Sequence, residues 1–348
     1  MQKIKAFCDR KGVKPSAKTY FVDAMGSMAL GLFATLLIST IFSTVGEYTG
    51  WVLFNEIAFY AKSCTGAALG IAIAHTLKAP PLVMLSASVV GMIGNGIADH
   101  HFMGVGDGGP AGAFLVCILA VELGKLVSKE TPIDILVTPV TTILSGGLAA
   151  LAICPAVSTV MSWLGHFINT ATEMQPLLMG VLVAVVVGMV LTLPISSAAI
   201  CAMIGISGLA GGAATAGCCA QMVGFAVISF RENKWGGLVA QGLGTSMLQM
   251  GNIVKNPRIW IPATLASAIT GPISTMVFKL ECTGVSAGMG TCGMVGPLGV
   301  LKEMGFTTYA WMAVVVACIV LPAVLSLLFA AILRKLGWIK EDDLKLAL

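Results

Sequence analysis

Long apolar runs, separated by short polar or glycine-rich connections, cover most of this sequence. Each run is about 17 to 25 residues long, the length that an α-helix needs to cross a bilayer. The clear runs are 24–45, 52–77, 81–98, 111–127, 133–154, 176–194, 262–279 and 309–333. A transmembrane barrel would instead show stretches of about ten residues with alternating character. The pattern therefore predicts an all-α integral membrane protein.

Three stretches in the second half depart from this regular pattern. Residues 196–230 are apolar but too long for one helix and too rich in glycine for a straight one, whereas 238–254 is short. Residues 284–299 contain too many glycines for a plain span. Because non-helical backbone survives at membrane depth only where protein or a water-filled cavity satisfies it, we expect a re-entrant hairpin there. The expected fold has about ten transmembrane helices, one or two of them broken.

The same pattern predicts how the chain is organised. Residues 155–175 place Trp163, Leu164 and Phe167 on a helical period with polar residues between them, which predicts an amphipathic interfacial helix. Short sequence similarities between residues 124–139 and 251–262 favour two related halves of the chain. Chance similarity between glycine-rich helices is the alternative. The predicted parts are a basic segment (1–23), one transmembrane domain (24–333, with halves 24–154 and 176–333 joined by 155–175) and a tail (334–348).

Composition and charge support the membrane assignment and orient the chain. Hydrophobic residues make up 57% of the sequence and charged residues only 10%, against about 25% charged residues in ordinary soluble domains. Six of the 20 Lys and Arg residues stand in the first 18 positions. By the positive-inside rule we expect this segment to lie in the cytoplasm, and the charges of the later loops predict a multi-pass protein of the cell (inner) membrane with both termini in the cytoplasm. No basic fold accompanies the segment, so no nucleic-acid partner is expected.

The ten cysteines are scattered through apolar runs without the spacing of a metal site. We therefore predict small apolar core residues rather than a disulfide framework, and neither a metal nor a cofactor.

The first glycine-rich segment, residues 94–114, gathers the most chemistry. It carries Asp99, His100, His101 and Asp107. A polar outer loop, a metal site and a sugar or anion site are the three interpretations. Adjacent histidines point in different directions, so a metal would need a third ligand that the sequence does not provide. A carboxylate and a histidine beside exposed backbone N–H groups suit hydrogen bonding to hydroxyls and proton transfer, and the plain loop stays open as the alternative.

Two carboxylates inside apolar runs also require a reason, because burying a charge in lipid is costly. Glu122 stands three residues before Lys125, so an intrahelical ion pair is the alternative to a substrate contact. Glu281 opens the second glycine-rich segment, where a carboxylate suits a substrate hydroxyl or a coupling ion; a helix cap is the alternative. Weaker candidates, each with a packing hydrogen bond as the alternative, are Asn95, Asn252, Gln249 and His166.

Residues 106–200, which include "GDGGPAGAF", "VELGKLVSKETPIDILVTPVTTI" and "MSWLGHFINTATEMQPLL", resemble membrane IIC components of the phosphotransferase system. Within that family the chain resembles the standalone PfoR-type group of predicted toxin regulators, and the likeness extends over most of its length. The resemblance implies a homodimer of about ten spans per chain with re-entrant hairpins. It also implies uptake of a sugar-like substrate that a separate IIB partner phosphorylates. A Glu and a His that hold the sugar correspond loosely to Glu281 and to His100 or His101.

Three functions follow from these observations. The leading hypothesis is a IIC-like permease that works by alternating access, with both glycine-rich segments lining the substrate site. The chain has no attached IIA or IIB domain, so its part in a phosphotransferase reaction is left open and no catalytic residue is assigned. The alternatives are a membrane sensor that binds a small ligand without moving it and an ion-coupled secondary transporter.

Overall fold

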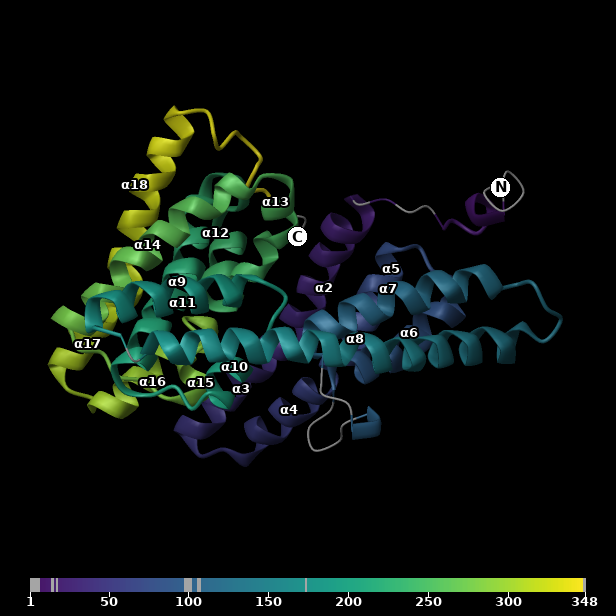
Figure 1. Ribbon diagram of the computed structural model, residues 1–348, viewed down its shortest axis with the longest axis horizontal. Helices are drawn as coiled ribbons and strands as arrows, with labels where there is room; N and C mark the ends of the chain where they lie inside the picture. Colours follow the sequence, from purple (N-terminus) through teal and green to yellow (C-terminus); the bar gives the residue numbers. More distant parts are fainter. Residues whose placement is uncertain are drawn as a thin grey trace. The chain divides into compact units, whose positions relative to one another are not determined.

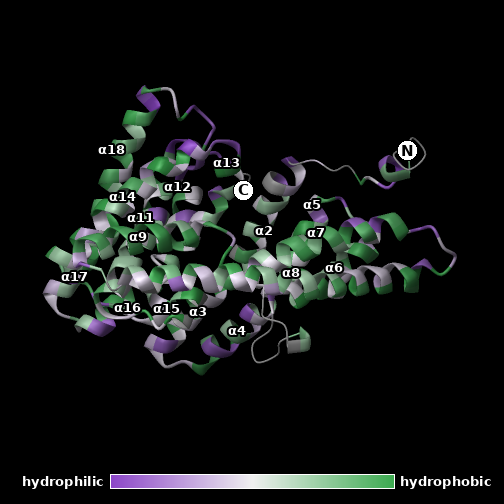
Figure 2. Cartoon of the chain, viewed as in Figure 1, coloured by the Kyte–Doolittle hydropathy of each residue, from purple (hydrophilic) through white to green (hydrophobic). Residues whose placement is uncertain are grey.

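The computed structural model describes residues 7–13, 16, 18–96, 102–104, 108–172 and 174–346. The regular structure of these residues is helical, and no strand occurs among them (Figure 1). The predicted all-α class is therefore confirmed. Apolar residues dominate most helices, as the hydropathy colouring shows (Figure 2), which is what helices surrounded by lipid require.

Five helical stretches in the described part of the chain are long and apolar enough to cross a membrane: Met25–Thr49, Gly109–Val127, Asp134–Thr172, Gly208–Ile228 and Thr308–Lys335. A sixth crossing is possible if Val52–Ser63 and Thr65–Thr76, which meet at 45°, form one bent span. Pro81–Asn95 and Pro176–Thr192 are apolar but shorter. These helices identify a membrane protein, while the predicted total of about ten crossings stays a prediction.

The chain forms two compact units: unit 1, Met1–Ser39 with Asn55–Val160, and unit 2, Thr40–Phe54 with Met161–Leu348. The helices of unit 1 are η1 (Thr19–Ala24), α2 (Met25–Leu32), η2 (Phe33–Leu37), α5 (Thr65–Thr76), α6 (Pro81–Asn95), η3 (Phe102–Gly104) and α7 (Gly109–Val127). Three helices have residues in both units: α3 (Ile38–Thr49), α4 (Val52–Ser63) and α8 (Asp134–Thr172). The predicted internal repeat stays a prediction.

The helices of unit 2 are shorter and more often interrupted. They are α9 (Pro176–Thr192), α10 (Ser197–Met203), α11 (Gly208–Ile228), α12 (Phe230–Val239), η4 (Ala240–Gly244), η5 (Ser246–Gln249), α13 (Met250–Lys255), η6 (Pro257–Trp260), α14 (Ile261–Pro272), η7 (Ile273–Val277), α15 (Gly284–Ala287), η8 (Cys292–Met294), α16 (Val295–Met304), α17 (Thr308–Val314), η9 (Val315–Val320) and α18 (Leu321–Lys335).

Glycine allows helices of unit 1 to pack backbone against backbone. A Cβ atom added at Gly70 of α5 would lie 1.9 Å from the carbonyl oxygen of Ala87 on α6. A Cβ atom added at Gly91 of α6 would lie 2.0 Å from the carbonyl oxygen of Gly66 on α5. Lipid gives no hydrophobic force between helices, so close contact through small residues supplies much of their association.

The ion pair that the sequence allows on α7 is present in the structure. Lys125 is 3% exposed, and its Nζ lies 3.1 Å from the Glu122 carboxylate. The same ammonium group donates to the carbonyl oxygens of Leu77, at 3.0 Å, and of Gly12, at 2.8 Å. Burial and the neighbouring Glu122 carboxylate raise the pKa of Tyr20 to about 12. Glu122 therefore neutralises a buried lysine that joins three segments of unit 1.

Helix α11 is the centre of unit 2 and packs against α9, α14 and α18. Its glycines do not interrupt it, contrary to the expectation of an irregular helix, because they serve close packing. A Cβ atom at Gly212 would lie 1.9 Å from the Leu280 carbonyl oxygen, and one at Gly217 would lie 2.0 Å from that of Ala184. The break in 196–230 comes earlier, between α10 and α11, where Gly205 has a φ of +62°. Residues 196–230 therefore form two helices, and the interruption lies at the first residues of the glycine-rich stretch 205–219.

Helix α8 joins two elements that the sequence separates. It runs without interruption for 39 residues and contains both the expected span at 133–154 and most of the expected interfacial helix. Pro155 lies inside it, since local adjustments in a helix can accommodate the missing N–H group. No helix boundary therefore occurs at residue 155.

The second glycine-rich segment is irregular, as predicted. It consists of the single turns α15 and η8 and the start of α16. Gly284, Gly290, Gly293 and Met294 all have positive φ angles. Three of these four are glycines, the residue that adopts this conformation at no steric cost. A re-entrant path through the membrane for this segment stays a prediction.

We expect Gly212→Ala to destabilise the protein by roughly 1–3 kcal/mol, because the new methyl group meets backbone that cannot rotate away. The measurement is the thermal unfolding midpoint in detergent. Gly26→Ala is the matched control: an added Cβ at this helical glycine meets nothing within 4 Å, so its midpoint should stay the same or rise slightly. Equal midpoints for the two variants would contradict the close packing of α11.

A second prediction concerns the buried ion pair of unit 1. Glu122→Gln leaves the Lys125 ammonium buried without its counter-charge, which we expect to cost about 3–5 kcal/mol. The double variant Glu122→Gln/Lys125→Met should lose less stability than the two single variants lose in sum, because no unpaired charge remains. The measurement is again thermal unfolding in detergent. An unchanged midpoint for Glu122→Gln would contradict a stabilising role for the ion pair. Glu122 would then stay a candidate for substrate binding.

Candidate functional site

A run of short helices between α11 and α14 carries five buried polar side chains of unit 2: Ser229, Gln241, Ser246, Gln249 and Asn252. Helix α12 has a kink at Lys234, whose φ and ψ are 51° and −150°. At Thr245 the backbone is extended, and the Thr245 hydroxyl accepts a hydrogen bond from the Met247 N–H group. The Asn256 side chain accepts one from the Arg258 N–H group in the same way. Each break leaves backbone groups unpaired, and polar side chains are needed to satisfy them.

Five side-chain amides from this run are linked to one another directly or through the C-terminal tail, and we call them the amide row: Asn233, Gln241, Gln249, Asn252 and Asn256. Within it, the Gln249 amide donates to Gln241 Oε1, at 2.9 Å, and the Asn252 amide donates to Gln249 Oε1, also at 2.9 Å. Gln241 and Gln249 are fully buried, and Asn252 is 9% exposed. The row therefore presents fixed donors and acceptors inside the unit.

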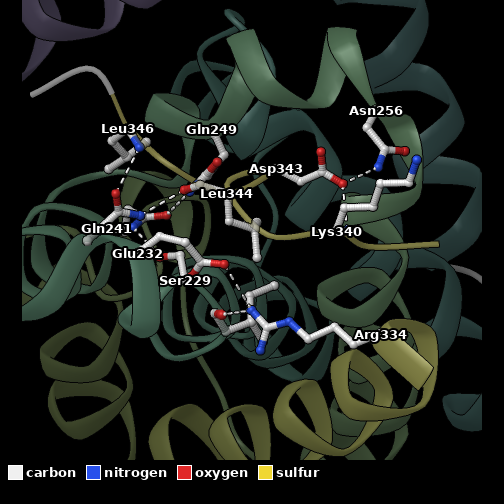
Figure 3. A network of polar contacts seen from close by, with 12 residues as sticks. Ser229, Glu232, Gln241, Gln249, Asn256, Arg334, Lys340, Asp343, Leu344 and Leu346 are labelled. Atoms are coloured by element: carbon white, nitrogen blue, oxygen red, sulfur yellow. Dashed lines mark hydrogen bonds and ion pairs between the residues drawn. The ribbon is translucent and has the colours of Figure 1, made fainter. Parts of the chain in front are cut away.

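The C-terminal tail, Trp338–Leu346, lies against this row. Figure 3 shows Gln241 and Gln249 near Leu344, and Asn256 beside Asp343. The carbonyl oxygen of Leu344 accepts from Asn233, at 2.8 Å, and from Gln249, at 2.9 Å. Asn252 donates to the Lys345 carbonyl oxygen at 2.9 Å. The row thus binds the tail mainly through peptide groups.

A second polar group, which we call the Gln221 cluster, lies among the apolar helices of the same unit. The Gln221 side chain is fully buried on α11. Its Oε1 accepts from the Trp260 indole N–H at 3.0 Å, and its amide donates to the Thr264 hydroxyl at 3.3 Å. The remaining members, Thr192, Ser246 and Ser267, bond to Gln221 or to one another.

The two groups are joined through one short helix. The Ser246 hydroxyl lies 2.8 Å from the Thr192 hydroxyl, and Ser246 begins the same short helix, η5, that ends with Gln249. Amide and hydroxyl groups that both donate and accept are the partners that sugar hydroxyls need. Aromatic rings such as Trp260 add an apolar surface with a single donor. The composition of the two groups is therefore compatible with a neutral, hydroxyl-rich ligand.

A cavity of about 550 Å³ lies beside the tail and has a different character. Its polar lining includes side chains of both charges: Arg231, Arg334, Lys340, Lys345, Glu232, Glu341 and Asp342. Arg334 lies 3.4 Å from Glu232, and Lys345 lies 3.7 Å from Asp342. The Arg334 guanidinium also donates to the Ile228 carbonyl oxygen at 2.7 Å. Charges of both signs suit a polar ligand or a charged protein surface.

The structure places the predicted site residues in quite different surroundings. Asn252 lies in the amide row together with Gln249, whereas Glu122 is paired with Lys125. Asn95 is half-buried and donates to the Gly96 carbonyl oxygen at 3.1 Å. Glu281 is exposed in the segment between η7 and α15, and His166 is exposed on α8. Outside the described residues lie Asp99, His100, His101 and Asp107.

Most members of the two polar groups were not predicted from the sequence. Gln221 was detectable, because it is the single amide in the apolar run of α11. Asn233 and Asn256 stand in polar stretches, where an exposed loop is the simpler expectation, and Gln241 stands in the short run 238–254. Among the residues that the structure describes, no three His, Cys, Asp or Glu side chains are arranged to hold a metal ion. Eight of the ten cysteines are buried, in agreement with their predicted role as small apolar core residues, whereas Cys8 is half-buried and Cys64 is exposed.

Comparison with known proteins identifies the family. Residues 22–346 match the family described as "Phosphotransferase system, EIIC". Neither the curated proteins nor the solved structures searched contain a match. The family match spans nearly all of the 348 residues, including both polar groups and the tail. The family implies a substrate and a phospho-carrier partner such as IIB. With its apolar helices and this match, the chain belongs to the EIIC family, the membrane components of the phosphotransferase system.

Proposed function

We propose that this protein is the permease component for a sugar or a similar small polar substrate and works by alternating access with a separate IIB partner. The observation that carries the proposal is the family match over residues 22–346. The Gln221 cluster and the amide row support it, because they supply buried amides and hydroxyls without a net charge. A site of this composition binds hydroxyls by hydrogen bonding and does not favour a charged ligand.

Charge distribution supports an orientation of unit 2. Lys255, Arg258, Arg334 and Lys335 stand at or just beyond the ends of α13, η6 and α18. By the positive-inside rule, these charges belong to the cytoplasmic side. The amide row and the tail would then face the compartment in which a phospho-carrier works. We also propose about ten crossings, both termini in the cytoplasm and a homodimer, in line with the family resemblance.

Among the predicted site residues, Asn252 has the best support for a role in this function, since it belongs to the amide row. Glu281 is next to irregular backbone and is proposed as a second contact for the substrate. Roles for Asn95, Asp99, His100, His101 and Asp107 stay predictions. Membership of the PfoR-type group is likewise a proposal.

The test of the proposal is uptake into vesicles that contain the purified protein, with radiolabelled hexoses, hexitols and disaccharides as probes. We expect phosphorylated product inside the vesicles only when phosphoenolpyruvate, the general carrier proteins and a IIB partner are present. Vesicles without the protein are the control. Uptake of unmodified substrate driven by an ion gradient would identify a secondary transporter instead. Binding without any uptake would identify a sensor.

A further prediction concerns the Gln221 cluster. Gln221→Met removes the partner of the Trp260 indole and of Thr264 while nearly preserving side-chain volume. If the cluster binds substrate, we expect uptake to fall by about tenfold or more, which corresponds to one or two lost hydrogen bonds. The measurement is initial uptake rate against substrate concentration, after circular dichroism has shown that the variant is folded.

Thr270→Val is the matched control for this change. The buried Thr270 hydroxyl bonds only to carbonyl oxygens of its own helix, those of Ala266 and Ser267, among the described residues. Its removal should leave uptake unchanged. Normal transport by a folded Gln221→Met variant would assign the cluster to helix packing.

A further inference from the structure

The amide row recognises a stretch of main chain, and that stretch belongs to the protein itself. Asn233 contacts the tail with both atoms of its amide: it donates to the Leu344 carbonyl oxygen and accepts from the Leu346 N–H, each at 2.8 Å. This is the pairing that one β-strand offers another, made here by a side chain. Gln249 and Asn252 add donors to consecutive tail carbonyls.

Few apolar contacts hold the tail in place. Ile339 is 3% exposed and Leu344 is fully buried, whereas Lys340, Glu341, Asp342 and Lys345 are exposed. Further attachments involve Asn256 and Arg258. Asn256 donates to the Trp338 carbonyl oxygen at 3.1 Å and to Asp343 Oδ2 at 2.8 Å, and the Arg258 guanidinium lies 5.2 Å from the centroid of the Trp338 ring. Segments with few buried apolar contacts open at lower free energy than the core. The tail therefore depends for its position on two buried apolar side chains, Ile339 and Leu344, and on these polar contacts.

The backbone turns at Gly337, where the tail leaves α18. Gly337 has a φ of +70°, and an added Cβ atom would meet nothing within 4 Å. The tail connects two parts of the interrupted helical run, because Asn233 lies on α12 and Gln249 and Asn252 lie on η5 and α13. Between these parts the backbone is extended at Thr245. When the tail is bound, it holds both sides of this break together.

We propose that residues 338–346 are an exchangeable strap: an intramolecular peptide ligand of the amide row whose release opens the row and loosens the break at Thr245. The site's ligand class is an extended peptide segment with a leucine anchor. In the bound state, carbonyl oxygens of the strap use the row's donors, so a polar substrate cannot reach them. This last consequence rests on the proposed function, whereas the exchange of the strap does not.

Hydrogen–deuterium exchange of the full-length protein in detergent tests the strap directly. Leu344→Asp places a charge at the buried anchor and should release the strap, so that amide protons of residues 230–256 exchange about tenfold faster. Leu346→Pro removes the N–H group that donates a hydrogen bond to Asn233. It should also speed exchange of these amide protons, by a smaller factor. Lys345→Gln is the control: its side chain is exposed and the row binds its carbonyl group, so exchange should not change. Unchanged exchange in both Leu344→Asp and Leu346→Pro would overturn the proposal.

A labelled peptide with the sequence of residues 338–346 tests whether the site is exchangeable. It should bind the Leu344→Asp protein, whose own strap is released, at least about tenfold more tightly than the wild-type protein. Adding Asn233→Leu to that protein should abolish the binding. Equal binding to wild type and Leu344→Asp, or no binding to either, would overturn the proposal. Neither readout needs transport, so both retain their meaning if the uptake experiment fails.

Discussion

Satisfying polar groups without water is the constraint on which this structure depends. In a chain with so few charged residues, each backbone or side-chain polar group inside the apolar helices must find a protein partner. Helices satisfy their own backbone, and glycines let those helices approach until carbonyl oxygens meet Cα atoms. Where unit 2 departs from regular helix, amides provide the missing partners. The amide row and the bound tail thus satisfy hydrogen-bonding groups of one another.

The family match and the physical description support different parts of the functional conclusion. The match places the chain among phosphotransferase membrane components but identifies no residue. The structure of unit 2 identifies two buried groups of amides and hydroxyls, the Gln221 cluster and the amide row. Neither group has a carboxylate among its members. The proposal of a hydroxyl-rich substrate rests on this composition together with the family membership.

Much of the fold was predictable because apolar length is a strong signal. The expected span at 111–127 is α7 within two residues, and the expected run at 309–333 is α17 to α18. Glycines were harder to interpret. Those of α11 were expected to unwind the helix, yet they pack it, because a glycine's effect depends on whether a neighbouring backbone is close. The same sequence signal at 284–299 does accompany irregular backbone.

The site was less predictable because its partners are distant in sequence. Asn252 and Gln249 were recognised as candidates, but the tail carbonyls that they bind lie about ninety residues further along the chain and have no side-chain signature. Glu122 could be assigned only after the structure placed Lys125 against the carbonyls of Leu77 and Gly12. A sequence shows which polar groups need partners, and only the fold shows which partners they have.

The length of α8 has a consequence for the surrounding lipid. Thirty-nine residues of helix extend about 58 Å at the usual rise per residue, roughly twice the hydrocarbon thickness of a bilayer. Such a rod must tilt steeply or project into the headgroup layer. Near its end the exposed rings of Trp163 and Phe167 stack with 6.2 Å between centroids, and aromatic rings favour that interfacial depth. The behaviour of the protein should therefore vary with acyl-chain length, and reconstitution in thin or thick membranes is itself an experimental variable.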